Sequence, residues 1–209
     1  NRMTAQPPTY LDLAGWPRRD AFEYFRGFDK PFFNVCTRVD VARLKQAVAD
    51  THVGSLALAY HFVALRLANA LEPFRYRLEG QRVRVHPVGG STTVLRDDGS
   101  FGFADFDHQA DFAAFAAPAA AAIAASRAGR APFEPKPDDP ARIHFTTLPW
   151  LHFTSFSHAR NWGREDSVPK LAFGRIDNDS ARAWMPLSVE VHHALMDGLH
   201  VGRFVQAFE

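Results

Sequence analysis

The sequence predicts one domain of the α/β (α+β) class, a mixed-sheet sandwich with packed helices that extends over residues 1–209. Short segments rich in aromatic and β-branched residues recur along the chain, as is typical of strands. Between them lie both tight turns and segments with apolar residues at helical spacing. Hairpins therefore alternate with helices that return to a sheet, and no repeat of fixed period is present.

The composition narrows the class of protein. Of 209 residues 46% are hydrophobic, which is enough for a sizeable core, and the formal net charge is +1 without a basic run for nucleic acid. No apolar stretch reaches the ~18 to 20 residues that span a bilayer, and the N-terminus lacks the apolar core of a signal peptide. The single cysteine, Cys36, excludes an intrachain disulfide framework. We expect a soluble cytoplasmic protein.

The first elements are a strand and two helices. Residues 32–39 form the strand, and Asp40 is positioned to cap the helix that follows. Ser55 is positioned to cap a second helix, which must end before Pro73. The apolar residues of the first helix that share one face are Val41, Leu44 and Val48.

Four short strands follow. Residues 75–78 and 82–86 alternate around Glu79 and Gly80, which predicts a hairpin with its arginines on the solvent face. Two further strands are expected at 92–95 and 101–106, separated by Asp98 and Gly99.

The rest of the chain continues the alternation. Residues 111–128 are nearly all alanine with phenylalanines at helical spacing, which favours a helix kinked at Pro118 over a low-complexity segment. Four prolines make 131–140 an extended connector, and we place no domain boundary there. Further strands are predicted at 142–147, 169–176 and 182–192, before a last helix. The apolar residues of that helix are Val201, Phe204, Val205 and Phe208.

One cluster of residues near the C-terminus could carry chemistry. Residues 189–198 read Val-Glu-Val-His-His-Ala-Leu-Met-Asp-Gly, a strand that leads into two histidines and an Asp-Gly turn. Adjacent residues on a strand point to opposite faces, so only one of His192 and His193 should face a cleft. A neutral imidazole there is suited to take a proton from a hydroxyl.

The residues alone leave two other interpretations of this cluster open. The first is a buried histidine that forms hydrogen bonds within the core. The second is a metal site that uses His192, His193 and Asp197. No Rossmann glycine pattern, Walker loop or nucleophile elbow is present to indicate other chemistry.

A resemblance separates these alternatives. The segment from His192, His-His-Ala-Leu-Met-Asp-Gly-Leu-His-Val-Gly-Arg-Phe, resembles the C-terminal signature of the trimeric chloramphenicol acetyltransferases. The short pattern also occurs in plant acyltransferases and in condensation domains, which resemble two such domains fused in one chain. Further segments resemble this family in its own order, over about the whole chain: 16–25, 33–40, 146–156 and 186–193.

The resemblance implies a role for each residue of the cluster. His193 would be the general base and His192 structural, while Asp197 would pair with Arg18 and fix the turn that carries the base. Thr146 matches the family's serine whose hydroxyl binds the oxyanion. Its β-branch restricts the rotamer, which puts the oxyanion geometry in question.

The acceptor pocket implied by the resemblance departs from the family pattern. Ala172 falls where the family commonly has a threonine that helps to position a water, and Trp150 matches the tryptophan of the coenzyme A channel. From the residues alone, Trp150 could equally be a core aromatic. Several pocket positions are not the small, sulfur-bearing or aliphatic residues usual there, so we expect a reshaped pocket. The positions are Phe25, Pro31, Phe101, Phe103 and His158.

Cys36 could indicate a covalent mechanism, because a thiol activated by a histidine can act as a nucleophile and form an acyl-enzyme. It lies in an apolar strand pattern, and free cysteine is among the most buried residue types, so we interpret it as a packing residue. We assign no site to the other histidines. These are His52, His61, His86, His108, His144, His152 and His200.

The function that the resemblance implies is acetyl transfer from acetyl-CoA to a hydroxyl, with chloramphenicol as the acceptor and antibiotic resistance as the outcome. The site would lie between the subunits of a homotrimer, with His193 from one chain and most of the acceptor pocket, including Thr146, from the next. No metal, nucleic acid or membrane is expected to take part. Two alternatives are acetylation of another hydroxyl acceptor and a non-catalytic trimer that binds a ligand.

Overall fold

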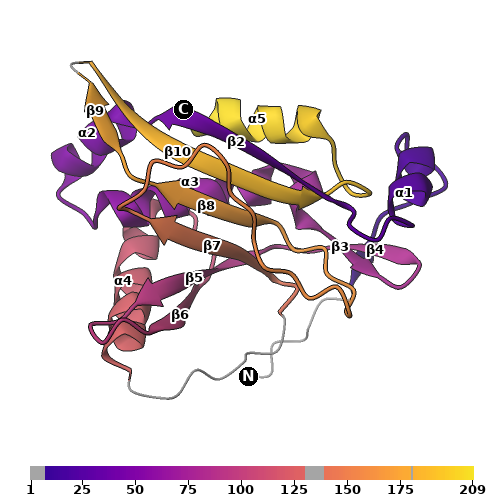
Figure 1. Ribbon diagram of the computed structural model, residues 1–209, viewed down its shortest axis with the longest axis horizontal. Coiled ribbons are helices and arrows are strands. Elements are labelled where there is room, and N and C mark those ends of the chain that lie inside the picture. Colours follow the sequence, from indigo (N-terminus) through magenta and orange to yellow (C-terminus); the bar gives the residue numbers. More distant parts are fainter. Residues whose placement is uncertain (1–7, 130–138, 180) are drawn as a thin grey trace.

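The computed structural model describes residues 8–129, 139–179 and 181–209 and is built around a mixed β-sheet (Figure 1). Within the described residues, the strands of this sheet follow the order β2-β10-β8-β7-β5-β6, and β9 also pairs with β10. The strands are β2 (Phe32–Asp40), β5 (Gly89–Leu95), β6 (Phe101–Phe106), β7 (Arg142–Leu148), β8 (Lys170–Gly174), β9 (Asp177–Asp179) and β10 (Arg182–His192).

The pairing confirms a mixed sheet. Strand β10 is antiparallel to β2, β8 and β9, and β5 is antiparallel to β6, whereas β7 is parallel to both β5 and β8. A smaller antiparallel sheet lies beside it, in the order β1-β4-β3. Its strands are β1 (Thr9–Tyr10), β3 (Tyr76–Glu79) and β4 (Arg82–Val85).

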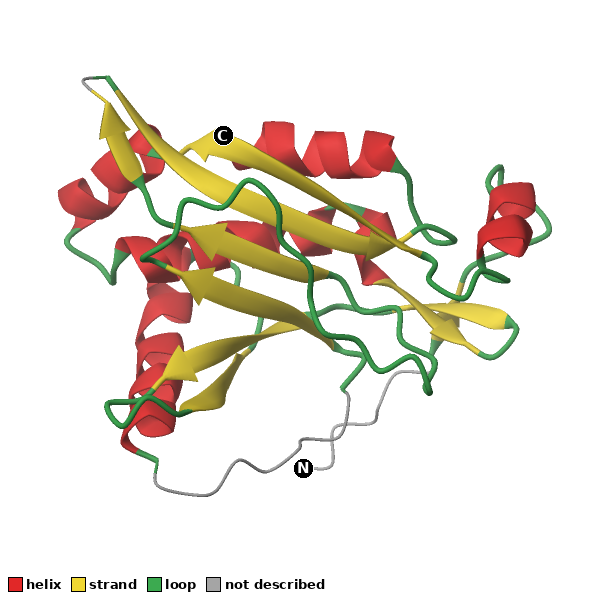
Figure 2. Cartoon of the chain, viewed as in Figure 1, coloured by secondary structure: helices red, strands yellow, loops and turns green. Residues whose placement is uncertain are grey.

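Different elements cover the two faces of the large sheet. Apolar side chains of the sheet form one core with those of three helices, α3, α4 and α5. The segment between β7 and β8 crosses the opposite face as an irregular loop, drawn in green in Figure 2. The helices are α1 (Arg19–Phe25), α2 (Ala42–Thr51), α3 (Leu56–Ala70), α4 (Phe112–Ala128) and α5 (Gly198–Phe208), with a 3-10 turn η1 (Glu72–Arg75).

Side-chain caps start two of the described helices, α3 and α4. The Ser55 hydroxyl accepts from the amide of Leu58, which confirms the predicted cap of α3, and the Asp111 carboxylate caps α4 in the same way. Asp40 lies one residue too early to be the cap of α2. Its carboxylate accepts from the amide of Ala42 and also from the amide of Ala183 in β10, so it joins helix and sheet.

The prediction that the arginines of the β3–β4 hairpin lie on its solvent face is wrong for Arg77. Its side chain is 2% exposed, and its guanidinium donates to the carbonyls of Phe74, Tyr76 and Pro140. These carbonyls replace water around the buried cation. The alternation of the hairpin did not reveal that the chain near Pro140 covers this side of it.

Other predicted elements are confirmed with small changes. Strand β10 has the predicted bounds, the strand expected at 169–176 is confined to Lys170–Gly174, and the short strand β9 was not predicted. Most of the connector expected at 131–140 lies outside the described residues. No single helix among those described is long and apolar enough to cross a membrane, and one bent pair, α2 with α3, passes on length and composition only.

Candidate active site

The two adjacent histidines lie in different environments, as their alternation predicts. His192 ends β10 and is 4% exposed; its ring packs against Phe32, and its Nδ1 accepts from the amide of Ala194 at 3.2 Å. Burial lowers its pKa to about 4, so the ring is neutral near pH 7. The side chain of His193 is 33% exposed. Only His193 is therefore available to a substrate.

Aromatic rings hold the imidazole of His193. The ring of Phe25, at the end of α1, stacks on it with 3.8 Å between centroids and 11° between planes. Phe33 of β2 packs against it at 4.7 Å. The amide of His193 donates to the carbonyl of Pro31 at 2.7 Å. Two residues predicted for the acceptor pocket, Phe25 and Pro31, are thus direct neighbours of His193.

The partners of His193 Nδ1 decide which ring nitrogen carries the hydrogen. Nδ1 lies 3.2 Å from the carbonyl oxygen of Met196 and 3.5 Å from Oδ1 of Asp197. Both atoms only accept hydrogen bonds, so Nδ1 carries the hydrogen of the neutral ring. The lone pair is then on Nε2, which is the arrangement that a general base needs.

Arg18 and Asp197 fix the turn between β10 and α5. Nε and Nη2 of Arg18 each donate to one carboxylate oxygen of Asp197, both at 2.7 Å. The same guanidinium donates to the carbonyls of His193 and Ala194, each at 3.0 Å. The hydrogen bond from Arg18 lowers the pKa of Asp197 and keeps it ionised. The pairing predicted for these two residues is confirmed.

A second group of predicted residues lies on another part of the sheet. Thr146 in β7 pairs with Ala172 in β8. Phe103 in β6 pairs with Thr93 in β5. Because β5 and β7 are parallel and Thr92 pairs with Phe145, the next residues, Thr93 and Thr146, lie at the same level. Phe103 and Thr146 are therefore at the same level on either side of β5. Phe101 lies on the same strand as Phe103, and its side chain is exposed. Trp150 follows β7 and is also exposed, so within this chain it is not a core residue.

One chain does not bring the two groups together. Thr146, Ala172 and Ser188 form one row across the sheet, and His192 lies four residues beyond Ser188 on β10. With a rise of ~3.3 Å per residue and ~4.8 Å between strands, the backbones of Thr146 and His192 are about 16 Å apart. His193 of the same chain therefore does not reach the Thr146 hydroxyl.

His158 belongs to neither group. It lies in the loop over β10, where its amide donates to Oε2 of Glu190 at 3.2 Å, while Nε of Arg160 donates to Oε1 at 2.7 Å. Burial raises the pKa of Glu190, but hydrogen bonds from His158 and Arg160 outweigh this and bring it to about 2. The Arg160 side chain, 1% exposed, also pairs with Asp166. This network anchors the loop to the sheet.

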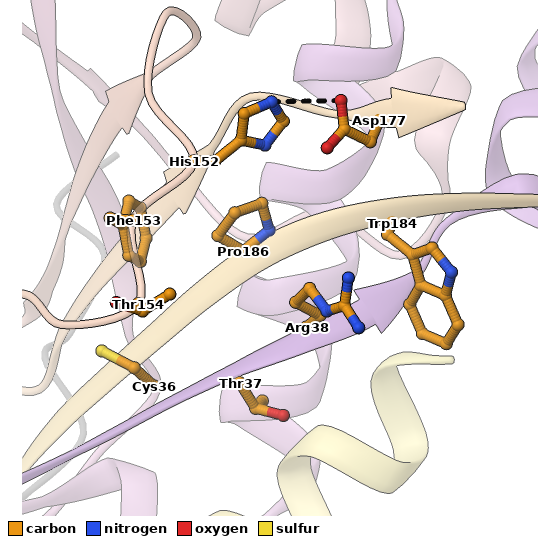
Figure 3. Close-up of a pocket in the computed structure, with 9 residues that line it drawn as sticks. All are labelled: Cys36, Thr37, Arg38, His152, Phe153, Thr154, Asp177, Trp184 and Pro186. Carbon is orange, nitrogen blue, oxygen red and sulfur yellow. Dashed lines mark ion pairs between the residues drawn. The ribbon is translucent and has the colours of Figure 1, made fainter. Parts of the chain in front are cut away.

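Cys36, interpreted from the sequence as a packing residue, is less buried than free cysteines usually are. Its side chain is half-buried, and its thiol donates to the side-chain oxygen of Asn34 at 3.2 Å. It lines a cavity of about 400 Å³ between β2, β10 and the loop after β7 (Figure 3). In the same cavity His152 pairs with Asp177, and the Arg38 guanidinium lies over the ring of Trp184. Cys36 is four residues from Phe32, the partner of His192, so it does not meet His193.

Sequence reasoning missed three residues around the site. Glu190 and Arg160 carried no signal, because their contact joins a strand to a loop 30 residues earlier. His200 had a signal: it lies three residues after Asp197, the position from which a side chain can reach back to the start of a helix. Among the described residues no group of three or more His, Cys, Asp or Glu side chains is placed to hold a metal ion.

A sequence model of the chloramphenicol acetyltransferase family matches residues 8–209. The chain belongs to this family. It is an acyltransferase, and the described part of the fold agrees: a solved chloramphenicol acetyltransferase superposes with a TM-score of 0.82 at 25% identity, over 97% of this chain and 98% of that one.

The curated relatives are distant but matched over nearly their full length. Chloramphenicol acetyltransferase 2 of Escherichia coli is 25% identical, over 96% of this chain and 95% of its own. The chloramphenicol acetyltransferase of Streptomyces acrimycini is 28% identical, over 97% and 93%. A dihydrolipoamide acetyltransferase of Azotobacter vinelandii shares the fold, with a TM-score of 0.63 at 18% identity, over 90% and 83%.

Proposed function

We propose that this acyltransferase moves an acetyl group from acetyl-CoA to a hydroxyl of a small acceptor, and that chloramphenicol is one such acceptor. The observation that carries the proposal is the state of His193. Its Nδ1 faces two acceptor oxygens, so the base is Nε2 of a partly exposed ring that Phe25 and the Arg18–Asp197 pair hold in place. The curated relatives, named as chloramphenicol acetyltransferases, support the choice of acceptor.

The reaction follows from this geometry. Nε2 of His193 takes the proton of the acceptor hydroxyl while the hydroxyl oxygen attacks the thioester carbonyl of acetyl-CoA. The carbonyl electrons move to the oxygen and give a tetrahedral oxyanion. When this intermediate collapses, the bond to sulfur breaks, and the imidazolium returns its proton to the coenzyme A thiolate. Both substrates are bound together, and no acyl-enzyme forms.

Thr146 would stabilise the oxyanion. A hydroxyl donates one hydrogen bond, and one such donor is worth about 2.7 to 4 kcal/mol of transition-state stabilisation in other enzymes. Thr146 stands beside Ala172, whose single methyl group supplies no second polar contact. The oxyanion therefore depends on the Thr146 hydroxyl from this part of the sheet.

The site would be completed by a second copy of the chain. Because His193 and Thr146 of one chain are separated by two strand spacings and by the five residues from Ser188 to His193, one chain provides two half-sites. A cyclic trimer would place His193 of each subunit against Thr146 of the next and form three equivalent sites. A lone subunit would have no activity.

The first experiment measures thiol release from acetyl-CoA, with and without chloramphenicol, with the His193→Gln variant as the control for background hydrolysis. We expect release that needs both the acceptor and His193. Release with a different alcohol but not with chloramphenicol would support an O-acetyltransferase with another acceptor. No release with any hydroxyl acceptor, together with binding of a small molecule, would support the non-catalytic alternative and refute the proposal.

The second experiment tests whether the site is shared. His193→Gln and Thr146→Val subunits, each inactive as pure trimers, are unfolded together in equal amounts and refolded. An active site then needs a Thr146→Val subunit that supplies His193 next to a His193→Gln subunit that supplies Thr146, so about one site in four is restored. Mixed trimers without activity would show that both residues act within one subunit.

A further inference from the structure

One peptide unit stands between the base and a second histidine. The carbonyl of the Met196–Asp197 peptide lies 3.2 Å from Nδ1 of His193. The amide of the same peptide donates to Nδ1 of His200 at 2.9 Å. The two imidazoles therefore contact opposite ends of one rigid, planar group. A rotation of this peptide would break both contacts at once.

The two contacts require opposite tautomers. His193 Nδ1 faces a carbonyl and so carries a hydrogen, whereas His200 Nδ1 accepts from an amide and so carries a lone pair. Burial lowers the pKa of His200. The nearby charges of Arg18 and Arg203 lower this pKa further, and the charge of Asp197 opposes them. His200 is thus neutral near pH 7, the state in which Nδ1 can accept.

The place of His200 in the fold explains this contact. It is the third residue of α5, whose N-cap is Asp197. In a capping box the side chain at this position accepts from the backbone of the N-cap residue and is usually Glu or Gln. Here the Asp197 carboxylate is engaged by Arg18, and His200 accepts from the Asp197 amide. Arg18 thus holds the side chain of Asp197, and His200 holds its backbone.

We propose that His200 is a positioning residue for the base, acting through the Met196–Asp197 peptide to fix the tautomer and the orientation of His193. The proposal rests on the proposed function of His193. An amide that donates a hydrogen bond makes the carbonyl of its own peptide a stronger acceptor, because the hydrogen bonds polarise one another. With His200 in place the Met196 carbonyl remains directed at Nδ1 of His193, and the lone pair remains on Nε2.

The test uses two substitutions of His200 and one control. His200→Leu removes the acceptor, and His200→Gln replaces it with the side chain that capping boxes usually use at this position. Gln206→Leu, exposed on the same helix, controls for an added leucine on α5. We expect His200→Leu to lower kcat about tenfold, a loss at the lower end of that seen when metal-ligating histidines lose an orienting partner. Because His200 would act through the base and not on the substrates, either KM should change little. His200→Gln should restore most of kcat, and Gln206→Leu should match the wild type.

A readout without turnover separates this proposal from the proposed function. Solid-state NMR of the full-length protein, with ¹⁵N in its histidine rings and the His193→Gln spectrum subtracted, reports which nitrogen of His193 carries the hydrogen. We expect a single Nδ1–H form in wild type and His200→Gln, and a mixture in His200→Leu. Pure Nδ1–H in His200→Leu, with an unchanged kcat wherever turnover is measurable, would overturn the role of His200 even if that variant is less stable. An enzyme without transferase activity would refute the proposed function, while the tautomer would still test the inference.

Discussion

The Arg18–Asp197 pair should show a coupling free energy that a double-mutant cycle can measure. Arg18→Met keeps the apolar stem and removes the guanidinium. Asp197→Asn keeps an N-cap of equal quality and removes the charge, so the loss of the cap does not enter the cycle. The contact of Arg18 with the ring of Trp16 is lost in both variants that lack the guanidinium and cancels.

The structure sets the size of the expected effect. Arg18→Met removes two hydrogen bonds to the carboxylate and two to the carbonyls of the turn. Loss of one partner of a buried pair costs about 3 to 5 kcal/mol, and we expect the lower end because the Asp197 side chain is 40% exposed and gains water. We expect a coupling of about 2 kcal/mol, within the range for hydrogen bonds to charged groups.

The assay is urea unfolding of the wild type, the two single variants and the double variant. All four are measured at one protein concentration, because the stability of the proposed trimer would depend on concentration. Thiol-release rates of the same proteins show whether the turn also positions the base. We expect the double variant to lose less stability than the sum of the single losses. Losses that add within about 0.5 kcal/mol would show that the pair contributes no interaction, and the reasoning would be wrong.

Three other predictions follow from individual side chains. His193→Gln should lower acetyl transfer by at least about 10²-fold while thermal unfolding stays close to wild type, because the ring is partly exposed and acts as a base; a large loss of stability would point to a structural role. Thr146→Ser should raise kcat without changing KM if the methyl group restricts the hydroxyl, and an unchanged kcat would place any deficit in the acceptor pocket. The buried imidazoles of His61 and His192, each with a folded-state pKa of about 4, should contribute stability in full above pH 6.5 and lose it as the pH falls toward 4. Urea unfolding at pH 7 and pH 5 tests this, and the midpoint should be lower at pH 5. His61→Phe should reduce the difference between the two midpoints.

The sequence by itself determined the local structure and the alternation by which only one of the two adjacent histidines can face a cleft. Capping at Ser55, the bounds of β10 and the opposite environments of His192 and His193 depend on residues close together in the chain, and each agrees with the structure. The residues by themselves did not identify the partner of Asp197. Arg18 lies 179 residues away, and only the resemblance to a known family pointed to it.

Contacts between distant segments were decided by the tertiary structure. The burial of Arg77 depends on where the chain near Pro140 passes, and the anchoring of Glu190 depends on a loop that has no periodic pattern. The pairing of three strands placed Thr146 far from His193 in one chain, which no spacing in the sequence could indicate. Local patterns reflect interactions within a helical turn or a strand pair, whereas these positions depend on how separate segments pack once the backbone has folded.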